Sequence, residues 1–118
     1  MIEDREYTTA EAMRFSGATE RQVGYWRGER FVTARITASN DALYPATEVL
    51  RMYVLARLGG KGKYVGRRMR KLTEKALNER WLLFNADWKL IVATDSQEEV
   101  LRISAAAKHP VRLVEMSA

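Results

Sequence analysis

Cysteine is absent from this chain of 118 residues, histidine occurs once and proline twice. Without cysteine the chain forms neither disulfides nor thiolate metal sites, which fits a reducing compartment. No apolar run approaches the roughly 20 residues that span a bilayer, and the start, MIEDREYTTAEAM, is too acidic and polar for a secretory signal. Because 47% of the residues are hydrophobic and 30% are charged, we expect a folded cytoplasmic protein with no membrane partner.

Groups that carry catalysis are equally scarce. The single histidine, His109, lies in a predicted turn. The glycine-rich stretch LGGKGKYVG is not a Walker loop, because neither Lys61 nor Lys63 is followed by Ser or Thr, and Val65 stands where a GxGxxG pattern needs its third glycine. No carboxylate pair is placed for acid–base work. We therefore expect a protein that is not an enzyme and that holds no cofactor and no metal.

Charge is distributed unevenly along the chain. Residues 1–80 carry 16 Lys and Arg against 10 Asp and Glu, a net charge of +6, whereas residues 81–118 carry 4 against 5, a net charge of −1. A basic first part is compatible with a polyanionic partner such as nucleic acid. Charge alone is equally compatible with a merely basic soluble protein.

Two short helices are predicted near the start of the chain. The stretch TTAEAMRFSG has a cap at Thr8 or Thr9 and ends at Gly17. A second helix follows with Thr19 as its cap. Two short helices joined by a tight turn that contains glycine predict a helix-turn-helix.

The second helix has two different faces. Val23 and Trp26 are three residues apart and should point into the core. The opposite side carries one cation, two glycines and a phenol: Arg21, Gly24, Tyr25 and Gly28. Glycine inside a helix costs about 1 kcal/mol and is tolerated if the backbone must approach something closely. We predict a recognition helix that begins at Thr19, with Thr19 among its DNA contacts. Arg21 and Gln22 should read base edges, and Tyr25 and Arg27 should contact phosphates.

A hairpin and two further helices are predicted next. Residues 31–37 have strand character, ASND is a turn, and ALY is a short return strand, so Arg35 and Tyr44 become candidate phosphate contacts. The next helix, TEVLRMYVLARLGG, should be the most buried. A fourth helix should run from Tyr64 to Asn78, with a narrow apolar stripe of Val65, Met69, Leu72 and Ala76.

The segment KGKYVGRRMRK, residues 61–71, holds six basic residues and no acidic one. Seen alone, it is as compatible with a solvated helix face as with a DNA contact. Beside a helix-turn-helix and a hairpin, it favours contact with backbone phosphates. The side chains we select for that contact are Lys61, Lys63, Arg67 and Arg68.

The last part of the chain predicts a strand-strand-helix-strand module. WLLF-NAD-WKLIVA is a hairpin, Ser96 and Glu99 form a capping box, and VRLVEM is a strand. The single helix can cover only one face of so apolar a sheet. The other face should need a partner, either the fourth helix or, as we favour, a second copy of the chain. Its side chains would come from Trp81, Leu83, Trp88, Leu90 and Val92.

The stretches SGATERQVGYWRGERFVTA, DALYPATEVLRM and LARLGG, in this order, resemble the MerR family of winged-helix transcriptional regulators. The resemblance covers about residues 7–78, and the RQ-x-x-YW form with a short tail is most similar to an actinobacterial branch. The matching positions are Gly17, Thr19, Arg21, Val23, Tyr25–Trp26, Phe31–Val32, Leu43–Tyr44 and Gly59–Gly60. The chain departs from the family at Gly24, Arg30 and Ala42, and it lacks the long dimerisation helix.

We therefore predict an α+β protein with a winged helix-turn-helix domain at 1–79 and a small ββαβ module at 80–118. Its expected function is sequence-specific binding of double-stranded DNA in bacterial or phage transcription, at the nucleoid. The expected partners are duplex DNA, a second copy of the chain and, as the resemblance implies, RNA polymerase. Two alternatives stay open: an excisionase-like or architectural factor that bends DNA, and a protein-interaction adaptor whose basic face is incidental.

Overall fold

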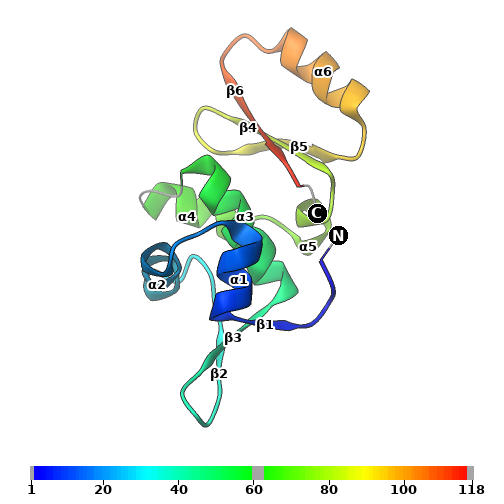
Figure 1. The fold of residues 1–118 in the computed structure, drawn as a ribbon. Coiled ribbons are helices and arrows are strands. Elements are labelled where there is room, and N and C mark those ends of the chain that lie inside the picture. The colour runs from blue at the N-terminus through cyan, green and yellow to red at the C-terminus, as the bar shows by residue number, and fades with distance from the viewer. Residues whose placement is uncertain (1, 60–62, 117–118) are drawn as a thin grey trace. The chain divides into compact units, whose positions relative to one another are not determined.

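The structure, a computed structural model, describes residues 2–59 and 63–116. Within these ranges it is an α+β protein with six helices and two three-stranded antiparallel sheets (Figure 1). The helices are α1 (Thr9–Ser16), α2 (Glu20–Gly28), α3 (Ala46–Leu58), α4 (Lys63–Arg70), α5 (Glu74–Leu77) and α6 (Gln97–Ala106). The strands are β1 (Glu6–Thr8), β2 (Arg35–Ile36), β3 (Ala42–Pro45), β4 (Trp81–Asn85), β5 (Leu90–Thr94) and β6 (Val111–Glu115).

The chain divides into two compact units, Ile2–Arg70 and Lys71–Ala118. The first unit holds α1 to α4 and the sheet β1-β3-β2, and the second holds α5, α6 and the sheet β5-β4-β6. The predicted domain boundary after residue 79 stays a prediction.

Helices α1 and α2 begin where their side-chain caps predict. The Thr8 hydroxyl accepts the N–H of Glu11, and the Glu11 carboxylate accepts the N–H of Thr8. This reciprocal pair satisfies two of the amides that a helix start leaves without partners. Gly17 ends α1 with a φ of 77°, in the left-handed region that glycine adopts without steric cost.

The first sheet is built around the central strand β3, which pairs with β1 on one side and β2 on the other. Strand β1 was not predicted, because its short sequence becomes a strand only by pairing with residues far along the chain. The predicted strand over 31–37 is wrong in length, since only Arg35 and Ile36 are extended and paired. Phe31 and Val32 are instead buried in the bend after α2.

Helix α3 is the buried centre of the first unit, as predicted, with eight of its 13 residues buried. It packs against α1 and β3, and the ring centroid of Tyr53 lies 5.7 Å from that of Phe15 on α1. Gly59 ends it with a φ of 84°. Gly60 and Lys61 lie outside the described residues.

The predicted helix from Tyr64 to Asn78 is wrong, because it is broken after Arg70. Thr73 is extended, and its hydroxyl accepts the N–H of Ala76, so it caps the new helix α5. Threonine competes for backbone hydrogen bonds in this way and favours caps over helix interiors. The predicted apolar stripe is nevertheless buried at Val65, Met69 and Leu72.

The second unit has the predicted order of two strands, a helix and a strand. Strand β4 lies in the middle and is antiparallel to both neighbours. Strand β5 begins two residues later than predicted, because Asn85 Oδ1 accepts the N–H groups of Asp87 and Lys89 and holds Trp88 at a φ of 63° in the turn. Helix α6 packs against β4 and β5.

The start of α6 differs from the predicted capping box in one half. The Ser96 hydroxyl accepts the N–H of Glu99, as expected. The Glu99 carboxylate, however, accepts the hydroxyl of Thr94 at 2.9 Å rather than the N–H of Ser96. The Ser96 N–H goes to the Thr94 oxygen, so Thr94 joins the two halves of the cap.

The apolar face that we expected to need a partner is partly buried, and its predicted contact with a second copy stays a prediction. Trp81 and Leu83 are buried, and the other three members, Trp88, Leu90 and Val92, are half-buried. The most exposed large apolar side chains of this unit are Ile91, Leu101 and Leu113. None of the described helices has the length and apolar character needed to cross a membrane.

Candidate nucleic-acid interface

Helix α2 presents two faces of opposite character. Val23 and Trp26 are each 1% exposed, whereas Tyr25 on the other side is 45% exposed. Arg21 is also exposed, and among the described residues it has no hydrogen-bond or ion-pair partner. A Cβ atom added at Gly24 or Gly28 would meet nothing within 4 Å. Packing among the described residues therefore gives no reason for either glycine, and it leaves the outer surface of the helix open to a ligand.

Thr19 and Gln22 are occupied by the cap of this helix. The Thr19 hydroxyl accepts the N–H of Gln22 at 3.1 Å, and Gln22 Oε1 accepts the N–H of Thr19 at 2.9 Å. The same capping-box pattern S/T-x-x-E/Q is visible in the sequence. Gln22 was predicted to read base edges. Its backbone N–H and its Oε1 are used by the two cap hydrogen bonds, and its side-chain Nε2 is not.

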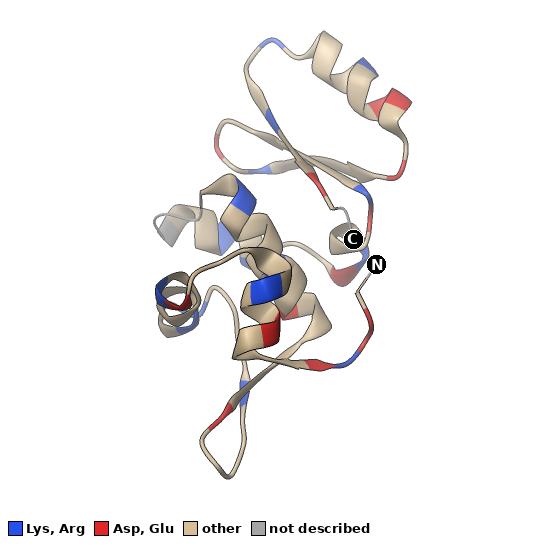
Figure 2. Ribbon diagram, in the orientation of Figure 1, with Lys and Arg blue, Asp and Glu red and all other residues tan. Residues whose placement is uncertain are grey.

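An aromatic contact joins α2 to α4. The ring of Phe31 lies edge-to-face against Tyr25, with the centroids 5.9 Å apart. Its other side lies on the backbone of Gly66, where an added Cβ would overlap the ring. The sequence pattern made Gly66 part of a failed phosphate-loop motif, whereas its position shows that it makes room for Phe31. The recognition-helix candidate and the basic helix are thus parts of one surface, and Figure 2 shows Lys and Arg on both.

A buried carboxylate fixes the same region from behind. Glu48 on α3 is 4% exposed and accepts hydrogen bonds from the Thr33 hydroxyl at 2.6 Å, Arg70 Nη1 at 2.6 Å and Arg51 Nη1 at 2.9 Å. We call these four residues the Glu48 cluster. Burial raises the pKa of Glu48, but the hydrogen bonds from Thr33, Arg70 and Arg51 outweigh burial and leave the pKa below its usual value.

The Glu48 cluster ties the segment after α2 and the end of α4 to α3. Sequence reasoning missed it, because a glutamate in the first turn of a helix is usually a solvated residue that favours the helix dipole. One signal in the sequence is its spacing, because Glu48 lies four residues before the buried Met52 and therefore on the same side of α3.

The hairpin β2–β3 is less suited to phosphates than the sequence suggested. Arg35 donates from Nε to Glu6 Oε2 at 2.9 Å and from Nη2 to Glu6 Oε1 at 2.8 Å. This side of its guanidinium is therefore already paired with a carboxylate of β1. Tyr44 is 0% exposed, which contradicts a direct phosphate contact. Its hydroxyl instead accepts a long 3.5 Å hydrogen bond from Arg27 Nη1 and steadies that side chain at the end of α2. Between Thr37 and Leu43 the hairpin has Asp41 and no Lys or Arg.

Helix α4 carries the remaining predicted contacts. Arg67 is exposed and has no hydrogen-bond or ion-pair partner among the described residues. Arg68 Nη2 donates to the hydroxyl of Tyr64 at 2.8 Å, and its guanidinium lies 5.0 Å from the centre of that ring. The predicted contacts of Lys61 and of the Lys63 side chain lie outside the part of the chain that the structure describes.

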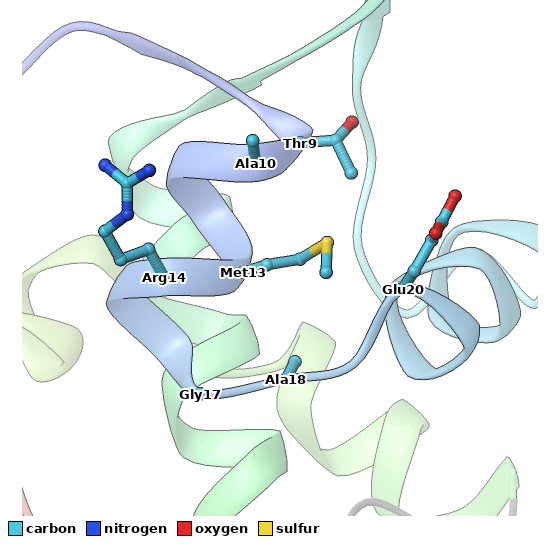
Figure 3. A pocket seen from close by; sticks show the side chains of 7 residues that line it. All are labelled: Thr9, Ala10, Met13, Arg14, Gly17, Ala18 and Glu20. Atoms are coloured by element: carbon cyan, nitrogen blue, oxygen red, sulfur yellow. The ribbon is translucent and has the colours of Figure 1, made fainter.

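A larger hollow of about 640 Å³ lies on the first two helices (Figure 3). Figure 3 shows Thr9 and Met13 on the side of α1 that faces Glu20, with Arg14 projecting from the other side. Ala10, Gly17 and Ala18 complete its lining. Glu20 supplies the one carboxylate of this lining, so the hollow offers no carboxylate pair for acid–base chemistry.

Metal-binding groups do not gather in the described ranges, where no three His, Asp or Glu side chains are close enough to hold an ion. Comparison with protein-family models and with curated proteins gave no match.

Proposed function

We propose that this chain is a sequence-specific duplex DNA-binding protein of the winged helix-turn-helix class, acting in the regulation of transcription. In this proposal α1 and α2 form the helix-turn-helix, β2 and β3 form the wing, and α2 enters the major groove. The resemblance to MerR regulators supports the proposal, as does the basic character of residues 1–80.

The observation that carries the proposal is the outer face of α2. An exposed arginine, an exposed tyrosine and two glycines without packing partners occupy the side opposite Val23 and Trp26. A helix that reads base edges needs donors on one face and a buried anchor on the other. Arg21 supplies the fork that pairs with guanine, while Tyr25 and Arg27 lie where phosphate contacts fix the register.

The wing has a smaller part in this proposal than in the sequence-based prediction. Arg35 is held by Glu6, and Tyr44 is buried, so the phosphate contacts come mainly from α2 and α4. We retain a homodimer as part of the proposal, because one recognition helix reads only a few base pairs and such proteins commonly pair on two half-sites.

Selection of bound sequences from random duplex DNA tests the proposal. We expect enrichment of a short site, and two copies of that site if the chain binds as a dimer. Binding without any enriched site, together with bending of the duplex, would favour an architectural factor instead. Absence of duplex binding at low salt would reject the proposal and favour a protein-interaction module.

A further inference from the structure

A small cavity lies between the end of α2 and the outer side of α4. Its volume is about 240 Å³, and it is lined by Glu29, Arg30, Phe31, Gly66, Arg67 and Arg70. A water molecule takes about 30 Å³ of liquid volume, so the cavity has room for a phosphate group and part of its hydration shell. Its floor is the contact between Phe31 and the backbone of Gly66, which gives it a fixed shape.

Arg30 has an unusual backbone conformation for its residue type. Its φ is 62°, in the left-handed region that glycine adopts at no cost and other residues adopt at a penalty. Among the described residues, its side chain has no hydrogen-bond or ion-pair partner. This conformation closes the end of α2, where the N–H of Phe31 donates to the carbonyl of Trp26 at 2.8 Å, and the Arg30 residue there lines the cavity.

The lining carries more positive than negative charge. Three guanidiniums, of Arg30, Arg67 and Arg70, meet one carboxylate in the lining, that of Glu29, while Glu48 behind Arg70 is shared with Arg51. Glu48 takes both hydrogen bonds from Nη1 of Arg70, so Nε and Nη2 lie outside that pair. A phosphodiester carries one negative charge, and guanidinium forks match its oxygens.

We propose that this cavity binds a single phosphate group, with Arg30 and Arg67 as its ligands and Arg70 held in place by Glu48. The favoured source is the backbone of a DNA duplex beside the groove that α2 enters, and in that form the inference rests on the proposed function. A free phosphorylated small molecule presents the same chemistry, and the experiment separates the two sources.

The test compares Arg30→Gly with the intact chain. Glycine relieves the left-handed backbone, so this variant should be at least as stable as the original, and Asn40→Gly at a φ of 66° is the matched control for that gain. Duplex binding should nevertheless weaken, and the slope of log affinity against log salt should fall by about one unit. Arg67→Gln should have the same effect.

Arg102→Gln, an exposed charge removal on α6, is the matched control for binding. If Arg30→Gly and Arg67→Gln bind duplex with the same slope as Arg102→Gln, the cavity holds no DNA phosphate. The proposed function would survive that result, because α2 could still read the groove.

If the intact chain binds no duplex, the proposed function fails and the cavity is tested with inorganic phosphate. The probe is the chemical shift of the Gly66 and Arg67 amides, measured against chloride at equal ionic strength. A saturable shift that Arg30→Gly removes would support a free phosphorylated ligand. An intact chain without a saturable shift would overturn the inference.

Discussion

The α2–α4 surface and the hairpin β2–β3 lie in the same unit and both carry arginine, but they use it differently. Arg21 and Arg67 point into solvent without a carboxylate partner among the described residues. On the hairpin, the guanidinium of Arg35 is paired with the Glu6 carboxylate through two hydrogen bonds. A basic residue in the sequence is therefore available to a polyanion only where the fold has not already paired it.

Removal of the Glu48 charge, behind the α2–α4 surface, should have the largest effect of the changes considered, a loss of folding stability. In Glu48→Gln, the guanidiniums of Arg51 and Arg70 lose their common partner, and breaking a buried pair in this way costs on the order of 3 kcal/mol. Urea unfolding measures the loss. Glu98→Gln, an exposed change on α6, is the control and should leave the stability almost unchanged.

The same carboxylate predicts a pH dependence. The pKa of Glu48 is below its usual 4.5 in the folded chain, so the stability it contributes is fully present above pH 4.5 and is lost as the pH falls through the lowered pKa. The intact chain should lose more stability than Glu48→Gln over this acid range. Equal losses would show that the Glu48 cluster does not stabilise the α2–α4 side.

The glycines of the two basic helices should respond in opposite ways. Gly66→Ala places a methyl group in the ring of Phe31 and should destabilise the fold by about 1–3 kcal/mol. In Gly24→Ala the added methyl group meets no atom within 4 Å. This variant should be more stable by up to about 1 kcal/mol, because alanine is the better helix former.

Measurement of duplex binding by Gly24→Ala tests whether the α2 backbone approaches DNA at this position. A stabilised Gly24→Ala variant that binds its selected site less tightly would indicate close approach of the α2 backbone to DNA. Unchanged affinity would remove that role from Gly24.

Arg21→Ala should weaken binding to the selected site more than binding to random duplex. A side chain on base edges carries about 1–3 kcal/mol of discrimination. Equal weakening on both duplexes would place Arg21 among the phosphate contacts, and no weakening would reject α2 as the recognition helix.

The smallest expected effect is at the hairpin. Glu6→Gln removes the partner of Arg35, so duplex affinity should rise slightly and the salt slope should steepen by up to about one unit. Glu98→Gln adds the same charge on α6 and is the control. Identical behaviour of the two variants would show that Arg35 does not reach DNA even when it is released.

Local features of the fold could be predicted from the sequence. Thr19 as a cap and the burial of Val23 and Trp26 depend on residues within one or two turns. The broken fourth helix was missed because the cap at Thr73 interrupts an apolar stripe that itself continues without a gap.

Features that depend on distant residues could not be predicted. Strand β1 exists by pairing with β3, and Glu6 meets Arg35 from 29 positions away. In the Glu48 cluster, Arg70 likewise meets Glu48 from 22 positions away. Phe31 was predicted to begin a strand, and its contact with Gly66 was missed because it requires α4 to fold back beside the end of α2.

Salt-dependent duplex binding by two matched double variants tests the central claim most directly. Arg21→Gln/Arg27→Gln removes two charges from α2, and Arg102→Gln/Lys108→Gln removes two exposed charges from the second unit. We predict tight, steeply salt-dependent binding by the intact chain, a loss of up to about two units of slope in the first variant and almost none in the second. No duplex binding by the intact chain, or equal slopes for the two variants, would contradict the assignment of α2 as the DNA-binding helix.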